Sequence, residues 1–238
     1  MASVLRFRGR IAGWGTASGT RVVVGRWDAS PFGAFADVMV ERPDGERVLL
    51  APSRDVADLV AATYRFDRVE IVPVAVAVAD EPTAATVATR DATDATDVEP
   101  GAGPGTVAGA ATDRGRLPGW RVAAGPLGAR VAFGRRAPLG RVLRAVPSGL
   151  ATSRHLTALT DPVARVVLRG VRTRGSAGPG RVEHYGATDV HALVAAETTW
   201  DGEPLGDLRD VDPPVRFGFG STPRRPSVTD VVTTIVVR

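Results

Sequence analysis

The sequence predicts a mainly β protein (α+β), folded as an antiparallel barrel or sandwich of two related halves with a short helical insertion. Short runs rich in Val, bounded by Gly, Pro or Asp, recur along most of the 238-residue chain, as is typical of strands joined by turns. Helical patterns are confined to a few short segments. A chain of this length can bury one large core or two small ones.

The chain divides at a segment that is poor in large apolar residues. Residues 80–117 consist mostly of Ala, Thr, Asp, Gly and Pro. This composition buries too little surface to offset the entropy of ordering the segment, so we expect a flexible linker there. The first β-rich half is then residues 1–79, and the second is residues 118–238, sharing one core with the first.

The two halves share a short pattern. The run RVVVGRWDASPFG from Arg21 aligns with RVAFGRRAPLG from Arg130 at the Arg-Val start, the Gly-Arg and the Pro-x-Gly. A strand and a Gly-rich turn, beginning at Arg10 and at Arg121, precede each run. The match predicts an internal duplication in which both copies contribute to one sheet. The alternative is a chance match in a chain that is rich in Arg, Val and Gly.

Local signals predict the elements of the first half. Apolar runs on both sides of Arg42–Gly45 predict a hairpin, because Pro-Asp-Gly favours a tight turn. Ser53 is a suitable N-cap for a helix over residues 54–64. The next strand is expected over residues 68–78, where Pro73 indicates an edge position or a bulge.

The second half is expected to differ by the helical insertion, over residues 138–170, in pieces that end at prolines and glycines. Residues 182–200 follow as a strand pair or as one long strand. Residues 215–221 and 227–238 are expected to close the chain as strands.

Composition excludes several reaction classes. All 30 basic residues are Arg, and the chain has no Lys, Asn, Gln or Cys. Without Lys, Schiff-base catalysis by a lysine and the Walker A phosphate loop are excluded. Without Cys, thiolate catalysis, iron–sulfur clusters and Cys-bound zinc are excluded as well. We expect no cofactor and no metal site.

Positive charge is concentrated in the second half. Residues 1–80 have no net charge, whereas residues 118–238 hold 17 Arg against ten acidic residues, a net charge of +7. An anionic partner is therefore expected to contact the second half. Nucleic acid is disfavoured, because no aromatic residues are interleaved with these arginines and no reading module is present.

Neither a membrane span nor a signal peptide is expected. No apolar run approaches the roughly 20 residues of a membrane-spanning helix. The N-terminal residues alternate Arg with apolar side chains, unlike the apolar stretch of a signal peptide. We therefore expect a cytoplasmic protein.

The best catalytic candidates lie on one predicted strand. On a regular strand, Tyr185, Asp189 and His191 share a face, which also carries Glu183. An Asp two residues from a His can orient its imidazole for acid–base catalysis. His184 would face the opposite side from His191, which disfavours a shared metal site. The alternative is a surface strand with polar residues pointing to solvent.

Arginines also gather around the Gly-rich loops of the second half. Arg binds carboxylate or phosphate with two parallel hydrogen bonds, and Gly-rich loops expose backbone N–H groups to the same anions. The alternative is that these arginines are solvated and paired with scattered acids. The candidate ligand-binding residues are Arg135, Arg136, Arg172, Arg174, Arg224 and Arg225.

Three segments, GRWDASPFG, VRTRGSAGPGR and FGFGSTPRRPS, resemble segments of uncharacterised proteins from high-GC actinobacteria. The absence of Lys and Asn agrees with a GC-rich source, because both residues have AT-rich codons. The resemblance implies no activity.

These patterns favour a protein that binds a small, partly apolar and anionic or amphipathic molecule in a β-barrel cavity rimmed by second-half arginines. One alternative is an enzyme that uses Tyr185, Asp189 and His191 as an acid–base site. Another is a structural or partner-binding protein. The sequence does not determine the oligomeric state.

Overall fold

The computed structural model describes residues 3–82, 116–145, 174–176, 181–218 and 222–237. Most of the expected linker lies outside the described residues. So does the insertion after Ala145, together with His155 and Arg172.

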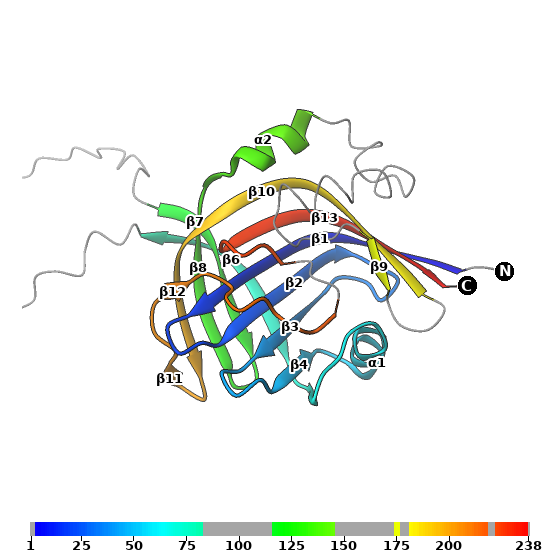
Figure 1. Cartoon of the computed structure of the whole chain (residues 1–238), viewed down its shortest axis with the longest axis horizontal. Coiled ribbons are helices and arrows are strands. Elements are labelled where there is room, and N and C mark those ends of the chain that lie inside the picture. The colour runs from blue at the N-terminus through cyan, green and yellow to red at the C-terminus, as the bar shows by residue number, and fades with distance from the viewer. Residues whose placement is uncertain (1–2, 83–115, 146–173, 177–180, 219–221, 238) are drawn as a thin grey trace, which may run out of the picture.

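The described chain folds mostly into strands of one sheet, with two short helices (Figure 1). The expected mainly β, antiparallel fold is confirmed, and the only parallel pair in the described sheet is β4 with β5. The helices are α1 (Arg54–Thr63) and α2 (Pro138–Ala145). The strands are β1 (Ser3–Thr16), β2 (Arg21–Ala29), β3 (Phe35–Glu41), β4 (Arg47–Ala51), β5 (Arg68–Ile71), β6 (Val74–Pro82), β7 (Arg116–Ala124), β8 (Leu127–Arg136), β9 (Arg174–Ser176), β10 (Arg181–Trp200), β11 (Glu203–Pro204), β12 (Leu208–Arg209) and β13 (Ser227–Val237).

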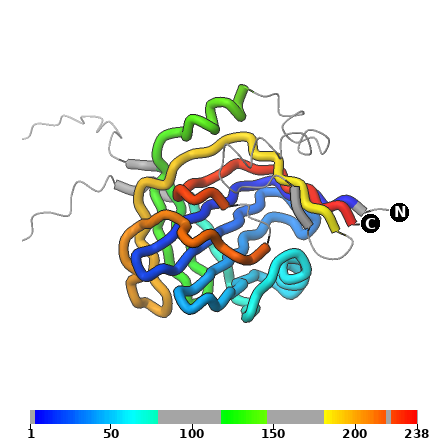
Figure 2. The backbone as a smooth tube through the Cα atoms, in the orientation of Figure 1, coloured from blue at the N-terminus to red at the C-terminus, as the bar shows by residue number. Residues whose placement is uncertain are grey.

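The sheet curls into a half-barrel (Figure 2). Its strand order is β5-β4-β3-β2-β1-β13-β10-β8-β7-β6, so β5 and β6 are its two ends. Along the chain, however, only Val72 and Pro73 separate β5 from β6. The two ends of the sheet therefore approach each other at this point. Because Pro73 has no N–H to continue a ladder, the single strand expected over residues 68–78 is divided into two.

Strands of both sequence halves share this sheet. β1 of the first half pairs with β13 of the second, and β6 pairs with β7. The hairpins of the expected repeat, β1–β2 and β7–β8, lie on opposite sides of β13 and β10 in the strand order. Internal duplication stays a prediction.

Local predictions are confirmed in several places. The hairpin around Arg42–Gly45 is present as β3 and β4, and Gly45 adopts a φ of +90°, which suits glycine. Ser53 caps α1 by accepting a hydrogen bond from the N–H of Val56 at 3.4 Å. Of the two alternatives for residues 182–200, the long strand is correct, since β10 is continuous.

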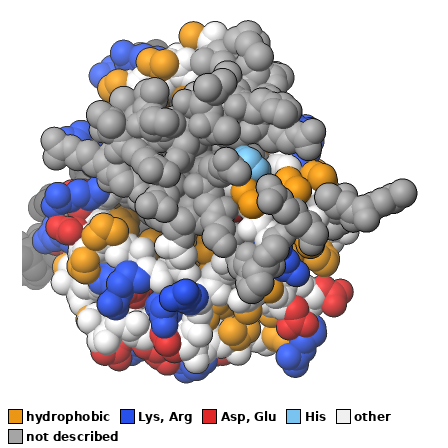
Figure 3. Space-filling view, turned by 45° about the vertical axis from the view of Figure 1, so that its right-hand side comes forward, with side chains coloured by type: hydrophobic (Ala, Val, Ile, Leu, Met, Phe, Trp, Pro, Cys, Tyr) orange, Lys and Arg blue, Asp and Glu red, His pale blue; other side chains and the backbone are white. Residues whose placement is uncertain are grey.

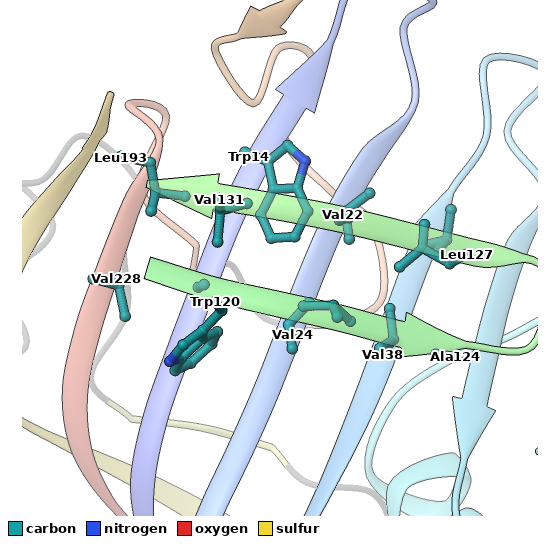
Figure 4. Close-up of a cluster of buried hydrophobic side chains, with 14 of the residues drawn as sticks. Trp14, Val22, Val24, Val38, Trp120, Ala124, Leu127, Val131, Leu193 and Val228 are labelled. Carbon is teal, nitrogen blue, oxygen red and sulfur yellow. The ribbon is translucent and has the colours of Figure 1, made fainter. Parts of the chain in front are cut away.

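The main core lies between the layers of the curled sheet, where β7 and β8 cross β1 and β2 (Figure 4). Trp14 of β1 and Trp120 of β7 are fully buried there. The indole Nε1–H of Trp14 donates a hydrogen bond of 3.0 Å to Thr198 Oγ1 of β10. Apolar side chains that pack with them include Val22, Val24, Val38, Leu127, Val131 and Leu193. The interior of the half-barrel is therefore a packed core.

The other face of the same strands is covered in part by α1. In β4, Leu50 belongs to the main core, whereas Leu49 and Ala51 point the opposite way. On that side they pack against Val56 and Val60 of α1. We call this side of the sheet the helix face. It carries the candidate site.

Candidate functional site

A pocket lies between α1 and the helix face of the sheet. Its lining comes from β1, β2, β3, β10 and β13 and from α1 with the residue that follows it. The void measures about 500 Å³ with its open mouth included, of which about 50 Å³ is wide enough for the centre of a water molecule. The larger figure includes open solvent, so the enclosed space is smaller than a typical drug-sized ligand site. The pocket is narrow, which favours a small, flat or slender molecule.

Aromatic rings form much of the pocket wall. The ring of Phe7 lies 5.7 Å from that of Trp27 and 6.4 Å from that of Phe35, measured between centroids. Both pairs are edge-to-face, an arrangement that aromatic rings prefer in cores. Aliphatic side chains complete the apolar lining, namely Ile11, Val23, Met39, Leu59, Val60 and Ile235.

Four acidic side chains line the same pocket: Asp37, Tyr64, Glu183 and Tyr185. The Tyr64 hydroxyl lies 3.0 Å from Oε2 and 3.2 Å from Oε1 of Glu183, and it also contacts the Tyr185 hydroxyl. Asp37 accepts a hydrogen bond of 2.9 Å from the indole N–H of Trp27. Asp37 is 4% exposed and Glu183 is 2% exposed, so both carboxyls are removed from water.

Burial sets the protonation of this cluster. Burial raises the pKa of Glu183 to about 7, and the nearby charge of Asp37 raises it as well. The hydrogen bonds from Tyr64 and Tyr185 lower this pKa but do not outweigh burial. Burial raises the pKa of Asp37 to about 6, partly offset by the hydrogen bond from Trp27. Burial and the neighbouring Glu183 raise the pKa of Tyr64 well above its usual value. Both carboxyls therefore titrate close to neutral pH, while Tyr64 stays protonated.

Thr233 of β13 adds a buried hydroxyl to the pocket. It lies directly opposite Phe7 and Tyr185 in the sheet and therefore shares their face. Thr233 is 2% exposed, and its Oγ1 has no hydrogen-bond partner in the described part of the structure. Leaving a buried polar group unpaired costs about 1–3 kcal/mol. Such a group is therefore a place where a bound molecule can form a hydrogen bond.

The elements place these side chains by strand alternation and by a helix end. Asp37 is an acidic residue within the apolar strand β3. Its neighbours Ala36 and Val38 point away from the helix face, so Asp37 points toward it. Tyr64 is the C-cap of α1, where its N–H donates to the Val60 carbonyl at 2.9 Å. Neither residue was among the site residues predicted from the sequence. The available signal was one Asp within an apolar strand, and nothing local linked it to Glu183.

A β-bulge changes the arrangement of the predicted catalytic residues. In the β10–β13 ladder Tyr185 lies opposite Thr233, and Asp189 lies opposite Asp230. Residues 233 and 230 point to opposite faces, because β13 is regular in its pairing with β1. The register shifts between Ala187 and Asp189, where one extra residue reverses the alternation.

The expectation that Glu183, Tyr185, Asp189 and His191 share one face is therefore wrong. Glu183 and Tyr185 line the pocket, whereas Asp189 and His191 lie on the other side of the sheet. The bulge also brings His184 and His191 to the same side, which corrects the second expectation for this strand. A catalytic role for Tyr185, Asp189 or His191 stays a prediction.

Asp189 forms a separate cluster at the start of α2. It is 5% exposed, and both of its carboxylate oxygens accept from Arg136 Nε, at 2.9 and 3.0 Å. Nε2 of His191 lies 3.5 Å from Asp189 and Nη1 of Arg144 lies 3.8 Å from it. Burial alone raises the pKa of Asp189, but the hydrogen bonds from Arg136 and from the N–H of Val190 outweigh it, and the pKa is lowered. The Asp189 carboxylate thus links β10 to Arg136, the last residue of β8.

The described arginines of the predicted ligand site are mostly paired or exposed. Arg224 lies 3.3 Å from Asp210 and 2.8 Å from Asp212, and all three are exposed. Arg135 and Arg225 are exposed too. On the face shown in Figure 3, Arg and acidic side chains lie interspersed. This agrees with the alternative of solvated arginines paired with acids.

None of the described residues that line the pocket is an arginine. Of the remaining candidates, Arg136 is paired with Asp189, Arg174 lies in β9, and Arg172 lies outside the described residues. Within the described ranges, no group of three or more His, Asp or Glu side chains is placed to hold a metal ion. None of the described helices is long and apolar enough to cross a membrane.

Comparison with known proteins yields no match: no family model, no curated protein and no solved structure is significantly similar to this chain.

Proposed function

We propose that the protein binds a small, mostly apolar molecule in the pocket between α1 and the helix face of the sheet. The observation that supports this is one buried unpaired hydroxyl and two buried carboxyls that lack an ion-pair partner among the described residues, all beside aromatic walls. The Thr233 hydroxyl is unpaired, and neither Asp37 nor Glu183 forms an ion pair among the described residues. Buried polar groups are normally paired, so exceptions in a pocket favour a bound molecule that completes them.

Another buried acid of the same protein makes the contrast clear. Glu41 is fully buried, and Arg21 Nη2 lies 2.9 Å from its Oε1. Arg216 donates to Oε1 through its Nε and to Oε2 through its backbone N–H, both at 2.7 Å. The negative charge of Glu41 is thus neutralised by two arginines. The pocket carboxyls Asp37 and Glu183 have no such partner among the described residues.

The proposal differs in two respects from the sequence-based prediction of an anionic ligand inside a barrel. Core side chains such as Trp14 and Trp120 fill the interior (Figure 4). The described lining of the pocket contains carboxyls and no arginine. Both features favour a ligand on the helix face and disfavour an anionic one, because buried like charges repel.

The indole signal of Trp27 provides a direct test. The chain has four Trp, and Trp27 lines the pocket while Trp14 and Trp120 lie in the main core. We expect 2-phenylethanol, a slender neutral probe, to shift the ¹H–¹⁵N indole signal of Trp27 saturably and to leave that of Trp14 in place. Trp27→Phe assigns the signal.

A matched pair of variants on α1 locates the site. Leu59 lines the pocket, whereas Ala62 of the same helix is exposed. Leu59→Trp should fill the void and abolish the shift, and Ala62→Trp should leave it unchanged. The proposal fails if 2-phenylethanol and its amine and carboxylate analogues all leave the Trp27 signal unshifted, or if Leu59→Trp binds them as the wild type does.

A further inference from the structure

We infer that the molecule bound in this pocket is a protonated primary amine with a slender apolar body, its ammonium group facing Glu183 and Asp37. The inference rests on the proposed function of the pocket and adds the chemical class of its ligand. It depends on three observations: the charge of the lining, the number of hydrogen-bond acceptors, and the nature of the walls.

Among the described residues that line the pocket, every ionisable side chain is an acid. Asp37 comes from β3, Tyr64 from the end of α1, and Glu183 and Tyr185 from β10. The described residues that β1, β2 and β13 contribute to the lining carry no ionisable side chain. When both carboxyls ionise, a double negative charge is buried without a counterion, which is costly in a medium of low polarity. A cationic ligand supplies the missing charge.

The hydrogen-bonding capacity also fits an ammonium group. A primary ammonium has three N–H donors and no acceptor. The pocket offers two carboxyls and the Thr233 hydroxyl, which can accept. An alcohol has a single O–H donor, so it leaves part of this capacity unused. A carboxylate ligand has acceptors only and would face two groups of its own charge.

The walls suit an organic cation rather than a hydrated metal ion. The rings of Phe7, Trp27 and Phe35 present an aromatic surface beside the acids. A cation within about 6 Å of a ring centroid is attracted by the ring quadrupole, most strongly for Trp. The apolar body of the ligand would contact the aliphatic side chains of α1, Leu59 and Val60.

Three probes with one skeleton separate these possibilities: 2-phenylethylamine, 2-phenylethanol and phenylacetate. Each is titrated at pH 7 into the ¹⁵N-labelled protein, and the dissociation constant is taken from the Trp27 indole shift. We expect the amine to bind about tenfold or more tightly than the alcohol, because charge-assisted hydrogen bonds are markedly stronger than neutral ones. Phenylacetate should bind most weakly.

Glu183→Gln removes the charge and keeps the shape of the side chain. It should reduce amine affinity about tenfold while changing the affinity of the alcohol by less than about twofold, since the amide oxygen of Gln can still accept the single O–H of the neutral probe. Glu203→Gln, at an exposed carboxyl of β11, is the matched control and should change neither. If Glu183→Gln does not fold, Asp37→Asn provides the same comparison.

The outcomes distinguish the two proposals. If the alcohol or phenylacetate binds as tightly as the amine, the ligand class is overturned and the binding pocket stands. The same holds if Glu183→Gln and Asp37→Asn both leave the preference for the amine intact. If none of the three probes shifts the Trp27 signal saturably, the proposed function itself is overturned.

Discussion

Replacing Glu183 by Gln should stabilise the protein at pH 8 and leave its stability nearly unchanged at pH 5. Burial raises the pKa of this carboxyl from 4.5 to about 7 in the folded protein. A raised pKa means that the folded state favours the protonated acid. The resulting stability is fully present below pH 4.5 and is lost as the pH rises through about 7.

The magnitude follows from the two pKa values. The difference between 4.5 and about 7 corresponds to roughly 3 kcal/mol of unfolding free energy, lost by the wild type between about pH 5 and pH 8. Gln carries no charge, and its amide oxygen can still accept from the Tyr64 hydroxyl, so this part of the pH dependence disappears. Asp37, whose pKa is raised to about 6, adds a dependence of the same sign that remains in the variant. Because each carboxyl raises the energy of the other's charge, the two contributions are not additive.

Urea unfolding followed by Trp fluorescence at pH 5, 6, 7 and 8 measures the effect. Glu203→Gln replaces an exposed carboxyl by the same amide and should follow the wild type at every pH. We expect the wild-type and Glu183→Gln curves to diverge above pH 6. Parallel curves from pH 5 to pH 8 would refute the reasoning, since they would mean that Glu183 ionises as easily in the fold as in the unfolded chain.

Two further variants test the other buried acids. Glu41→Gln should lower the free energy of unfolding by about 3–5 kcal/mol, because it leaves the buried guanidinium of Arg21 without its charge partner; a loss below about 1 kcal/mol in urea unfolding would contradict this. Arg136→Ala should cost about 1 kcal/mol at pH 7, a modest value because the Arg136 side chain is 35% exposed. Since the pKa of Asp189 is lowered in the fold, its stabilisation is present above pH 3.8 and is lost as the pH falls below that value. The variant should therefore lose less stability than the wild type on acidification, and an equal loss would count against the pairing.

Local signals were sufficient for the elements that depend only on neighbours in sequence. The Pro-Asp-Gly turn of the β3–β4 hairpin and the Ser53 cap of α1 are examples, because turn and cap preferences are properties of a few consecutive residues. The mainly antiparallel β class followed in the same way from strand-length runs between turns.

Features that depend on partners far along the chain were predicted only in part. The bulge before Asp189 has no local signature, and it alone decides which side of β10 carries Asp189 and His191. The division at Pro73 was visible as an irregularity. That β5 and β6 would become opposite ends of one sheet depends on their pairing with β4 and β7.

The sequence by itself determined the residue types available for a site, the β class and the excess of arginine in the second half. Only the tertiary structure decided that the described lining of the pocket holds acids and no arginine. Hydrogen bonding in the sheet and the end of α1 bring together Asp37, Tyr64 and Glu183, of which Tyr64 and Glu183 are 119 residues apart in the chain. Their raised pKa values are a consequence of that shared burial, since desolvation acts on a carboxyl only after distant segments have excluded water from it.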